Sequence, residues 1–361
     1  MKKILYICPF SPCCNHAGTV YTRQLLDELS KNCIIDLVYF CYPSDKRYKD
    51  HDNISVLKVF EISTSLKIHG VLLNPFTFPL FSSRYENSIR IYLQSQINST
   101  GYDFVYFDFS QSFVYASLLN HPNKILMAHD VMAQKYSRMK TYLRPWAMRS
   151  ERKMLKEGTV FTFSEKDCKL IKELYGINSY PTTFFLSKEV QEAEPKDGDF
   201  FVFFGGWDRE ENYETIEWYL DNVNHLIPEI KIKVIGGGLP DHIKERLKQY
   251  PNFEYLGFVD NPYPIIASAK AEIAPLKKGA GVKVKCIDAL GCGTPVVGTE
   301  VAFEGIPKEF SEFMIKAEMP TDYVEMLSTL NISIPSRLLF KNDFISRYNN
   351  KKILSFIRGT N

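Results

Sequence analysis

Apolar runs of strand length alternate along the chain with segments of helical spacing, and the alternation occurs in two separate series. Such runs indicate parallel strands, because a strand covered by helices on both faces is apolar throughout. The first series contains KILYICPF, IIDLVYFCY, residues 102–107, KILMAHD and TVFTFS. The second contains FFVFFGG, KIKVIGGG, FEYLGF, AEIAPL and TPVVGT. Each series predicts one doubly wound, Rossmann-like sheet of the α/β class.

Two series in 361 residues predict two domains, because a single hydrophobic core rarely grows to that size. Residues 187–199, SKEVQEAEPKDGD, are polar and contain Pro195 and Gly198, so this stretch is typical of a linker. We therefore expect an N-terminal domain over residues 1–188 and a C-terminal domain over residues 189–335. The basic, aromatic residues 336–361 are too few for a domain and predict a helical tail.

Composition narrows the class of protein. A formal net charge of +2 gives no concentrated basic footprint for nucleic acid. The eight cysteines are scattered without zinc-ligand spacing, which is typical of reduced cytoplasmic thiols. The opening MKKILYICPF is interrupted by Pro9 and Pro12 and predicts a buried strand rather than a secretory signal. These features favour a cytoplasmic protein that binds neither nucleic acid nor metal.

Glycine-bearing turns follow three strands of the second series. They lie at Gly205 and Gly206, around Gly237, and in residues 277–285, KKGAGVKVK. Ligands of open α/β sheets bind beyond the carboxyl ends of the strands. Glycine lets a backbone approach a ligand closely, and the start of a helix offers N–H groups to phosphate. These three turns are therefore candidate phosphate-binding loops.

The third turn combines glycine, lysine and a helix start, which suits a diphosphate. Lys283 or Lys285 would neutralise its charge, and Asp288 in the following helix is placed to accept hydrogen bonds from a ribose. The alternative is that the glycines only turn the chain and the lysines form a solvated face. The turn alone does not decide between the two interpretations.

Taken in order, these segments resemble the family-4 glycosyltransferases of the GT-B fold, in the branch that builds bacterial surface polysaccharides. The resemblance is strongest in GAGVKVKCIDALGCGTPVVGTEVAFEGI, and FVFFGGWDREENYETIEWYL, KIKVIGGG, FEYLGFVDN and AEIAPL match in order. Upstream, SPCCNHAGTVYTRQLLDEL, MAHD and FTFSEKD are similar to the first loop, the histidine loop and a Ser-Glu helix start. The resemblance implies two Rossmann-like domains facing a central cleft, with a C-terminal helix that crosses back to the N-terminal domain.

The resemblance also implies roles for residues of the third turn. Asp288 stands where the family has the second Glu of its Glu-x7-Glu signature, which holds the donor ribose. The first Glu would fall at Ala280, so contacts to the donor sugar would come from the backbone of residues 279–282 or from elsewhere. The same branch often shows this replacement.

Two further family residues have no counterpart here. The Arg and Lys that usually follow the first glycine turn of the C-terminal half are absent, and Trp207 and Asn212 lie nearby instead. Lys283 is then the best candidate to neutralise the diphosphate.

In the N-terminal half, the resemblance implies that His129 contacts the donor sugar and that Gly18 allows close approach of donor or acceptor. The alternatives are a capping or packing role for His129 and a helix N-cap at Gly18, which Thr19 follows. We predict His129 and Lys283 as catalytic residues. The predicted donor-binding residues are Gly18, Gly205, Gly206, Gly237, Gly279, Ala280, Gly281, Val282, Lys283, Lys285 and Asp288.

The activity that the resemblance implies is retaining transfer of a sugar from a nucleotide-sugar co-substrate to a saccharide acceptor, without metal or cofactor. No HExxH motif argues otherwise. Two alternatives stay open, a nucleotide-sugar 2-epimerase and a donor-binding pseudo-enzyme. The second follows from Ala280 and the absent Arg and Lys.

One N-terminal stretch bears on the acceptor. Residues 135–156 carry eight Lys or Arg among Tyr136, Tyr142 and Trp146, and Glu151 is the only acidic residue there. A basic aromatic segment of this kind can lie on an anionic membrane surface, assisted by the apolar residues 71–81. A lipid-linked saccharide at the inner face of the cell membrane would then be the acceptor. The alternative is a solvated helix beside an ordinary buried loop.

Overall fold

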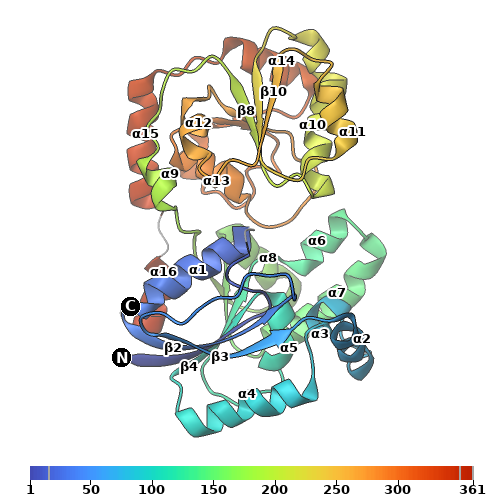
Figure 1. Cartoon of the computed structure of the whole chain (residues 1–361), viewed down its shortest axis with the longest axis vertical. Coiled ribbons are helices and arrows are strands. Elements are labelled where there is room, and N and C mark those ends of the chain that lie inside the picture. The colour runs from blue at the N-terminus through green and yellow to red at the C-terminus, as the bar shows by residue number, and fades with distance from the viewer. Residues whose placement is uncertain (15–16, 349–350, 360–361) are drawn as a thin grey trace. The chain divides into compact units, whose positions relative to one another are not determined.

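The computed structural model describes residues 1–14, 17–348 and 351–359, which form two compact units. The N-terminal unit comprises residues 1–185 together with 350–361, and the C-terminal unit comprises residues 186–349. Each unit is built on one parallel β-sheet flanked by helices, which confirms the predicted α/β class (Figure 1).

The sheet of the N-terminal unit has seven strands in the order β3-β2-β1-β4-β5-β6-β7. Their bounds are β1 (Lys2–Cys8), β2 (Cys33–Cys41), β3 (Ile54–Glu61), β4 (Phe104–Asp108), β5 (Lys124–Ala128), β6 (Thr159–Thr162) and β7 (Ser179–Pro181). The five predicted strands are all present. The sequence did not predict β3 and β7, because both are edge strands with partly exposed residues and lack a continuous apolar run.

Helices connect these strands, and their ends follow from local sequence. The bounds are α1 (Ala17–Ser30), α2 (Thr64–Leu73), α3 (Pro79–Ser82), α4 (Asn87–Thr100), α5 (Phe113–Ala116), α6 (Met132–Arg138), α7 (Arg144–Leu155), α8 (Glu165–Tyr175) and α16 (Lys351–Arg358). At the start of α8, the Ser164 hydroxyl accepts a hydrogen bond from the Asp167 N–H, and Gly176 ends this helix in the left-handed conformation.

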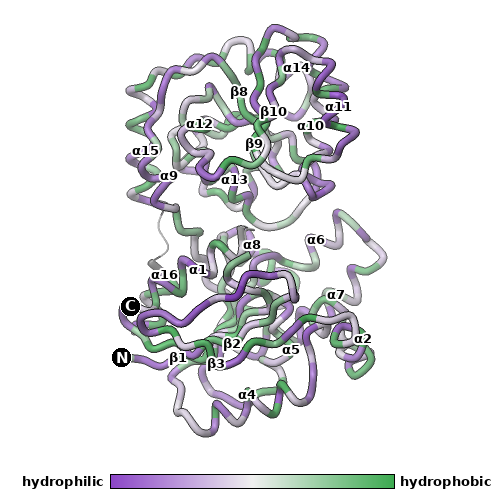
Figure 2. The backbone as a smooth tube through the Cα atoms, viewed as in Figure 1, coloured by the Kyte–Doolittle hydropathy of each residue, from purple (hydrophilic) through white to green (hydrophobic). Residues whose placement is uncertain are grey.

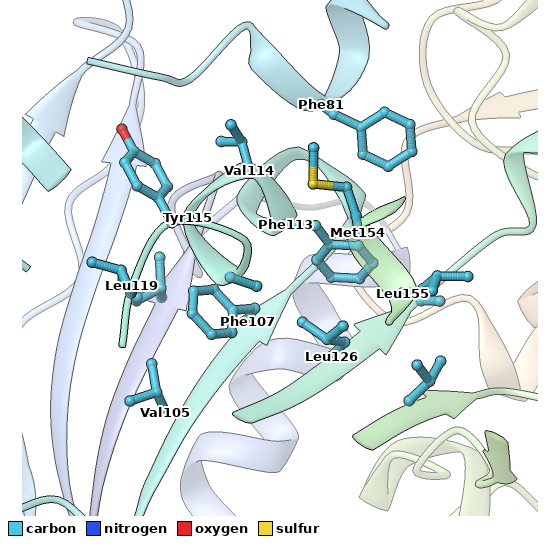
Figure 3. Close-up of a cluster of buried hydrophobic side chains, with 14 of the residues drawn as sticks. Phe81, Val105, Phe107, Phe113, Val114, Tyr115, Leu119, Leu126, Met154 and Leu155 are labelled. Carbon is cyan, nitrogen blue, oxygen red and sulfur yellow. The ribbon is translucent and has the colours of Figure 1, made fainter. Parts of the chain in front are cut away.

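One core cluster of the N-terminal unit packs beneath the strands that carry site residues. Figure 3 shows Phe107 of β4, Leu126 of β5, Phe113 of α5 and Met154 of α7 gathered in it, and all four are buried. Interdigitated side chains of this kind resist displacement. The carboxyl ends of β4 and β5 are therefore held in fixed positions.

The sheet of the C-terminal unit has six strands in the order β10-β9-β8-β11-β12-β13. They are β8 (Phe201–Phe204), β9 (Ile232–Ile235), β10 (Phe253–Gly257), β11 (Glu272–Ala274), β12 (Val296–Gly298) and β13 (Met314–Lys316). The helices are α9 (Lys188–Glu192), α10 (Glu210–Asn222), α11 (Asp241–Leu247), α12 (Tyr263–Ser268), α13 (Val284–Gly291), α14 (Pro320–Thr329) and α15 (Ile334–Arg347). The five predicted strands are present, and β13 is an addition, an edge strand whose residues are partly exposed.

Hydropathy along the backbone follows this layering. In Figure 2 the hydrophobic colour covers much of the N-terminal sheet, whereas α4 changes colour repeatedly along its length. In α4 the buried residues are Ile89, Leu93 and Ile97, which share one face of the helix. Strands buried on both faces and helices buried on one face are what a doubly wound sheet requires.

The predicted linker is instead the first part of the C-terminal unit. Residues 188–192 form α9, whose start is capped by the Ser187 hydroxyl. Val190 is fully buried beside Gly291 of α13, where an added Cβ would lie 2.6 Å from its Cγ1 atom. The prediction was wrong because a short helix that buries one apolar side chain remains polar overall.

The predicted tail of residues 336–361 divides between the two units. Helix α15 belongs to the C-terminal unit, where its Arg337 and Lys341 side chains are buried and donate hydrogen bonds to backbone carbonyls. Helix α16 belongs to the N-terminal unit, as the prediction of a C-terminal helix crossing back requires. There Lys2 Nζ donates a 2.7 Å hydrogen bond to the Ile357 carbonyl.

Candidate functional site

Both sheets reverse their strand order at one point. The reversal lies between β1 and β4 in the N-terminal unit and between β8 and β11 in the C-terminal unit. Loops that leave the carboxyl ends of such neighbouring strands run in opposite directions and leave a crevice there. The predicted glycine turns after β8 and β11 therefore lie at the reversal of their sheet.

The turns after β8 and β9 contact each other directly. The Trp207 N–H donates a 2.9 Å hydrogen bond to the Gly237 carbonyl, just beyond Gly205 and Gly206. Gly236 has φ of 127° and lies so close that an added Cβ would be 1.8 Å from the Gly205 carbonyl oxygen. The two backbones can approach in this way only because a side chain is absent.

The third turn has the glycine geometry expected of a tight loop that opens a helix. Gly279 and Gly281 have φ of 107° and 67°, and α13 begins directly after Lys283. Lys283 Nζ donates to the carbonyls of Gly281 at 2.7 Å and Ala280 at 3.4 Å. Its ammonium thus lies over this turn at the start of α13, with half-buried Val282 as its chain neighbour.

Lys285 links the third turn to the first. Its Nζ lies 5.8 Å from the centre of the Trp207 ring, within the range of a cation–π contact. Trp207 itself is fully buried and donates from Nε1 to the Ile235 carbonyl, so it is a core residue rather than a ligand-binding one. Asn212 holds the first turn through a hydrogen bond to the Gly206 carbonyl.

Asp288 lies on α13 beside Tyr263 of α12. The Tyr263 hydroxyl is 3.4 Å from Asp288 Oδ2, and burial raises the pKa of the Asp288 carboxyl to about 7. A carboxyl with this pKa changes between hydrogen-bond acceptor and donor near neutral pH. Binding of a hydroxyl pair by Asp288 would therefore depend on pH.

A second carboxyl behind α13 was not predicted. Glu272 of β11 is fully buried, and burial raises its pKa to about 8. Among the described residues neither of its side-chain oxygens has a hydrogen-bond partner, and Lys285 is the cation that opposes the shift. The run AEIAPL gave no signal of this, because an acidic residue at a strand start is usually exposed.

In the N-terminal unit, His129 follows β5 and meets Asp108, the last residue of β4. His129 Nε2 and Asp108 Oδ1 are 2.8 Å apart, and the Phe109 ring stacks on the imidazole at 3.6 Å between centroids. The sequence prediction included His129 but missed Asp108. An apolar run that ends in one acidic residue does not show which side chain that residue will meet.

Gly18 lies inside α1, as its second residue, and not at the helix N-cap. A Cβ added there would lie 2.6 Å from two atoms of the Phe109 ring and 3.1 Å from His129 Nδ1. The structure thus brings Gly18 and His129 together, and the glycine leaves room for the ring stack. The Gly18 and His129 positions belong to one unit, and the turns around Gly205, Gly237 and Lys283 belong to the other.

The basic aromatic segment forms α6 and α7, and Glu151 is its buried anchor. Glu151 accepts hydrogen bonds from the N–H groups of Met132 and Ala133 at the start of α6 and from the Tyr175 hydroxyl. Lys140, Arg149, Arg152, Lys153 and Lys156 are exposed. The neighbouring residues 71–81 are only partly a buried loop, since Phe78 and Phe81 are buried but Leu72, Leu73 and Phe76 are exposed.

Two Rossmann-like units with this strand order define the fold, because this is the architecture of the GT-B fold. Residues 198–331 match the family model described as "Glycosyl transferases group 1". This match lies within the C-terminal unit, where the sequence resemblance was strongest, and it agrees with that resemblance.

Known proteins similar to the chain agree with this class. An uncharacterized 44.6 kDa protein in the cps region of Klebsiella pneumoniae is 26% identical over 172 residues, which make up 43% of this chain and 44% of that protein. The chain thus matches less than half the length of this curated relative. Sucrose-phosphate synthase from Thermosynechococcus elongatus has a TM-score of 0.72 at 15% identity, covering 99% of this chain and 98% of that chain.

HepE from Anabaena, solved with UDP and glucose, has a TM-score of 0.68 at 12% identity, covering 100% of this chain and 99% of that chain. At such low identity these solved structures establish the fold alone.

Proposed function

We propose that this chain is a retaining glycosyltransferase that moves a sugar from a nucleotide-sugar donor to a saccharide acceptor in the synthesis of a cell-surface polysaccharide. The observation that carries the proposal is the lysine and glycine turn that opens α13 at the strand reversal. Gly279, Gly281 and Lys283 supply backbone room and a cation at that place. The UDP in HepE, which has the same fold, supports a nucleotide-bearing donor.

The residues of the site suggest catalysis by positioning and charge stabilisation. Lys283 and the N–H groups at the start of α13 would stabilise the departing nucleotide diphosphate. The acceptor hydroxyl would attack on the face from which the diphosphate leaves, without an enzymic nucleophile, metal or cofactor. Asp288 would accept hydrogen bonds from the ribose.

A panel of nucleotide sugars, incubated with and without saccharide acceptors, tests this proposal. We expect nucleotide release that depends on the acceptor, with the anomeric configuration of the donor retained in the product. Interconversion of the donor sugar without transfer would instead indicate a 2-epimerase. Donor binding without turnover would indicate a pseudo-enzyme, for which the alanine at position 280 is the motivation.

Donor affinity should fall as the pH is lowered from 8 to 6. Burial raises the pKa of Asp288 to about 7, so below this pH its carboxyl is protonated and accepts fewer hydrogen bonds from a ribose. Calorimetric titration with a nucleotide sugar measures the effect, and its diphosphate diester has no ionisation near pH 6. In Asp288→Asn the affinity should be lower and should no longer change over this range. An equal pH dependence in both proteins would remove Asp288 from the donor site.

We also propose that the N-terminal unit binds an anionic membrane surface and takes a lipid-linked acceptor there, in the cytoplasm. Phe76 is 85% exposed and Leu72 70% exposed, and the Phe76 carbonyl accepts a hydrogen bond from Trp146 Nε1 in basic helix α7. Exposed apolar side chains beside exposed cations suit an interface with anionic lipid. None of the described helices is long and apolar enough to cross a bilayer.

Phe76→Ser should weaken binding to vesicles that contain anionic lipid by about tenfold, because burial of this side chain contributes about 1.5–3 kcal/mol. Sedimentation with vesicles of phosphatidylcholine and phosphatidylglycerol measures it. The matched control is Phe258→Ser, which removes an equally large side chain that is 70% exposed in the C-terminal unit. The proposed membrane surface would be contradicted if the wild type did not bind the vesicles. It would also be contradicted if neither high salt nor the loss of Phe76 weakened binding.

A further inference from the structure

Asp108 lies at the strand reversal of the N-terminal sheet, where its carboxyl faces three neighbouring elements. It is the last residue of β4, between β1 and β5, and it is fully buried. A buried carboxyl is unfavourable unless hydrogen bonds replace the lost water. The hydrogen-bond partners of Asp108 therefore indicate its role.

Each carboxyl oxygen of Asp108 lies within hydrogen-bond distance of a side-chain donor. Oδ2 accepts from the Tyr6 hydroxyl at 2.9 Å and lies 2.5 Å from the Thr22 hydroxyl, and the Cys8 thiol is 3.9 Å away. Oδ1 lies 2.8 Å from His129 Nε2. Because a carboxylate only accepts hydrogen bonds, Nε2 must carry the hydrogen, and the neutral ring keeps a lone pair on Nδ1.

Aromatic rings hold the imidazole plane. Phe109 stacks on it with 8° between the planes, and Phe163 and Tyr21 meet it edge-on at 5.0 and 5.8 Å between centroids. Phe109 has φ of 57°, which is unfavourable for a residue with a large side chain. The Ser112 hydroxyl lies 2.9 Å from the Phe109 carbonyl oxygen and 2.8 Å from that of Asp108, which fixes the strained turn. Strain of this kind is typical of functional sites.

The other ring nitrogen, Nδ1, lies beside Gly18. An added Cβ at Gly18 would lie 3.1 Å from His129 Nδ1, and the His129 side chain is 11% exposed. In the part of the chain that the structure describes, the only hydrogen bond of the His129 ring is the one to Asp108. The ring is therefore clamped at Nε2 and by its faces, while Nδ1 is left for a further partner.

We propose that Asp108 is a positioning residue that fixes His129 in the Nε2–H tautomer, so that Nδ1 accepts a hydrogen bond from a hydroxyl of the bound saccharide. The tautomer and the orientation follow from the contacts of Asp108. The identity of the partner as a sugar hydroxyl rests on the proposed function. Asp108 itself does not touch the saccharide and acts through His129.

The tautomer can be observed without any activity. In protein labelled with 15N-histidine, two-bond proton–nitrogen correlation spectra at alkaline pH distinguish the two neutral tautomers, and His129→Gln assigns the signal. We expect the pure Nε2–H pattern in the wild type. In Asp108→Asn an amide N–H2 facing Nε2 should shift the ring toward the Nδ1–H form. A wild-type ring in the Nδ1–H form, or one unchanged by Asp108→Asn, would overturn the proposal.

Kinetics test whether Asp108 acts through His129. Asp108→Asn should lower kcat/KM for sugar transfer by about 10–100-fold, the loss found for carboxylates that orient a metal-binding histidine in the same way. In the double variant with His129→Gln, the asparagine should add no further loss. Full additivity of the two losses would contradict the proposal.

Two control variants separate positioning from stability. Tyr6→Phe removes a hydrogen bond to Oδ2 but not the His129 contact, and Asp36→Asn changes a buried carboxyl bonded to the Tyr102 hydroxyl elsewhere in the sheet. Both should lower the melting temperature without changing the tautomer of His129. If neither donor nor acceptor is turned over by the wild type, the proposed function fails while the spectra still decide the role of Asp108.

Discussion

Lys283→Ala should weaken binding of a nucleotide sugar by about 10–100-fold, the value expected for loss of a charge-assisted hydrogen bond worth about 1.5–3 kcal/mol. Lys283 Nζ lies 2.7 Å from the Gly281 carbonyl oxygen at the start of α13. A diphosphate at this helix start would face both the ammonium and the N–H groups of the first turn. Isothermal titration calorimetry with the donor measures the loss directly.

The matched control for this prediction is Lys278→Ala. Lys278 lies in the same loop, but its Nζ pairs with Glu214 at 2.7 Å and with Glu210 at 3.8 Å, so its charge is already compensated. Lys283→Met keeps the apolar stem and separates loss of the charge from loosening of the turn. The prediction would be contradicted if Lys283→Met left donor affinity unchanged while Lys278→Ala reduced it. The diphosphate would then not bind at the start of α13.

The strands that the sequence predicted are those buried on both faces. In β1, Ile4 to Cys8 are all buried, so the run KILYIC shows its role without any knowledge of its neighbours. Edge strand β3 has one buried residue, Ile54, among partly or fully exposed ones, and β7 contains Pro181, so neither run is distinctive. The sheet order, and with it the strand reversal, follows from pairing that no single run encodes.

The sequence predicted the glycine turns of the candidate site, which depend on backbone conformation. It did not predict the side-chain pairs, which depend on contacts between distant residues. Gly279 and Gly281 are recognisable because only glycine readily adopts their φ values. Asp108 and Glu272 are each one acidic residue at the end of an apolar run, and such residues are usually exposed there. Asp108 meets His129, which comes from another element, and Glu272 is influenced by the charge of Lys285, so neither environment exists before the chain folds.

Contacts that form only in the folded chain also explain why the predicted tail of residues 336–361 divides between the two units. Arg337 and Lys341 lie on α15 among other charged residues, and a sequence read alone assigns such side chains to solvent. In the structure Arg337 donates to the carbonyls of Gly293, Ala267 and Lys196, and Lys341 donates to that of Ala193. Backbone carbonyls carry no sequence signal, so the unit that binds α15 cannot be predicted from composition.

Arg337→Ala should therefore destabilise the C-terminal unit by about 3 kcal/mol or more, since several buried carbonyls would lose their donor at about 1–3 kcal/mol each. Arg337 Nη2 lies 2.6 Å from the Ala267 carbonyl oxygen, and Nε lies 2.8 Å from that of Gly293. Burial lowers the pKa of the guanidinium to about 10, so it stays charged at neutral pH. Urea unfolding followed by tryptophan fluorescence measures the loss of stability, because two of the three tryptophans lie in this unit.

Arg347→Ala on the same helix is the matched control. Arg347 is exposed and pairs with Asp343 at 2.8 Å and Glu309 at 3.0 Å, so its loss should leave the free energy of unfolding almost unchanged. Gly293 and Thr294 follow the C-cap residue of α13, Cys292, and Arg337 donates hydrogen bonds to both. Arg337→Ala should thus also weaken donor binding, because the helix that we propose binds the diphosphate loses its fixed end. Equal stability of the Arg337 and Arg347 variants would show that α15 is not anchored through this guanidinium.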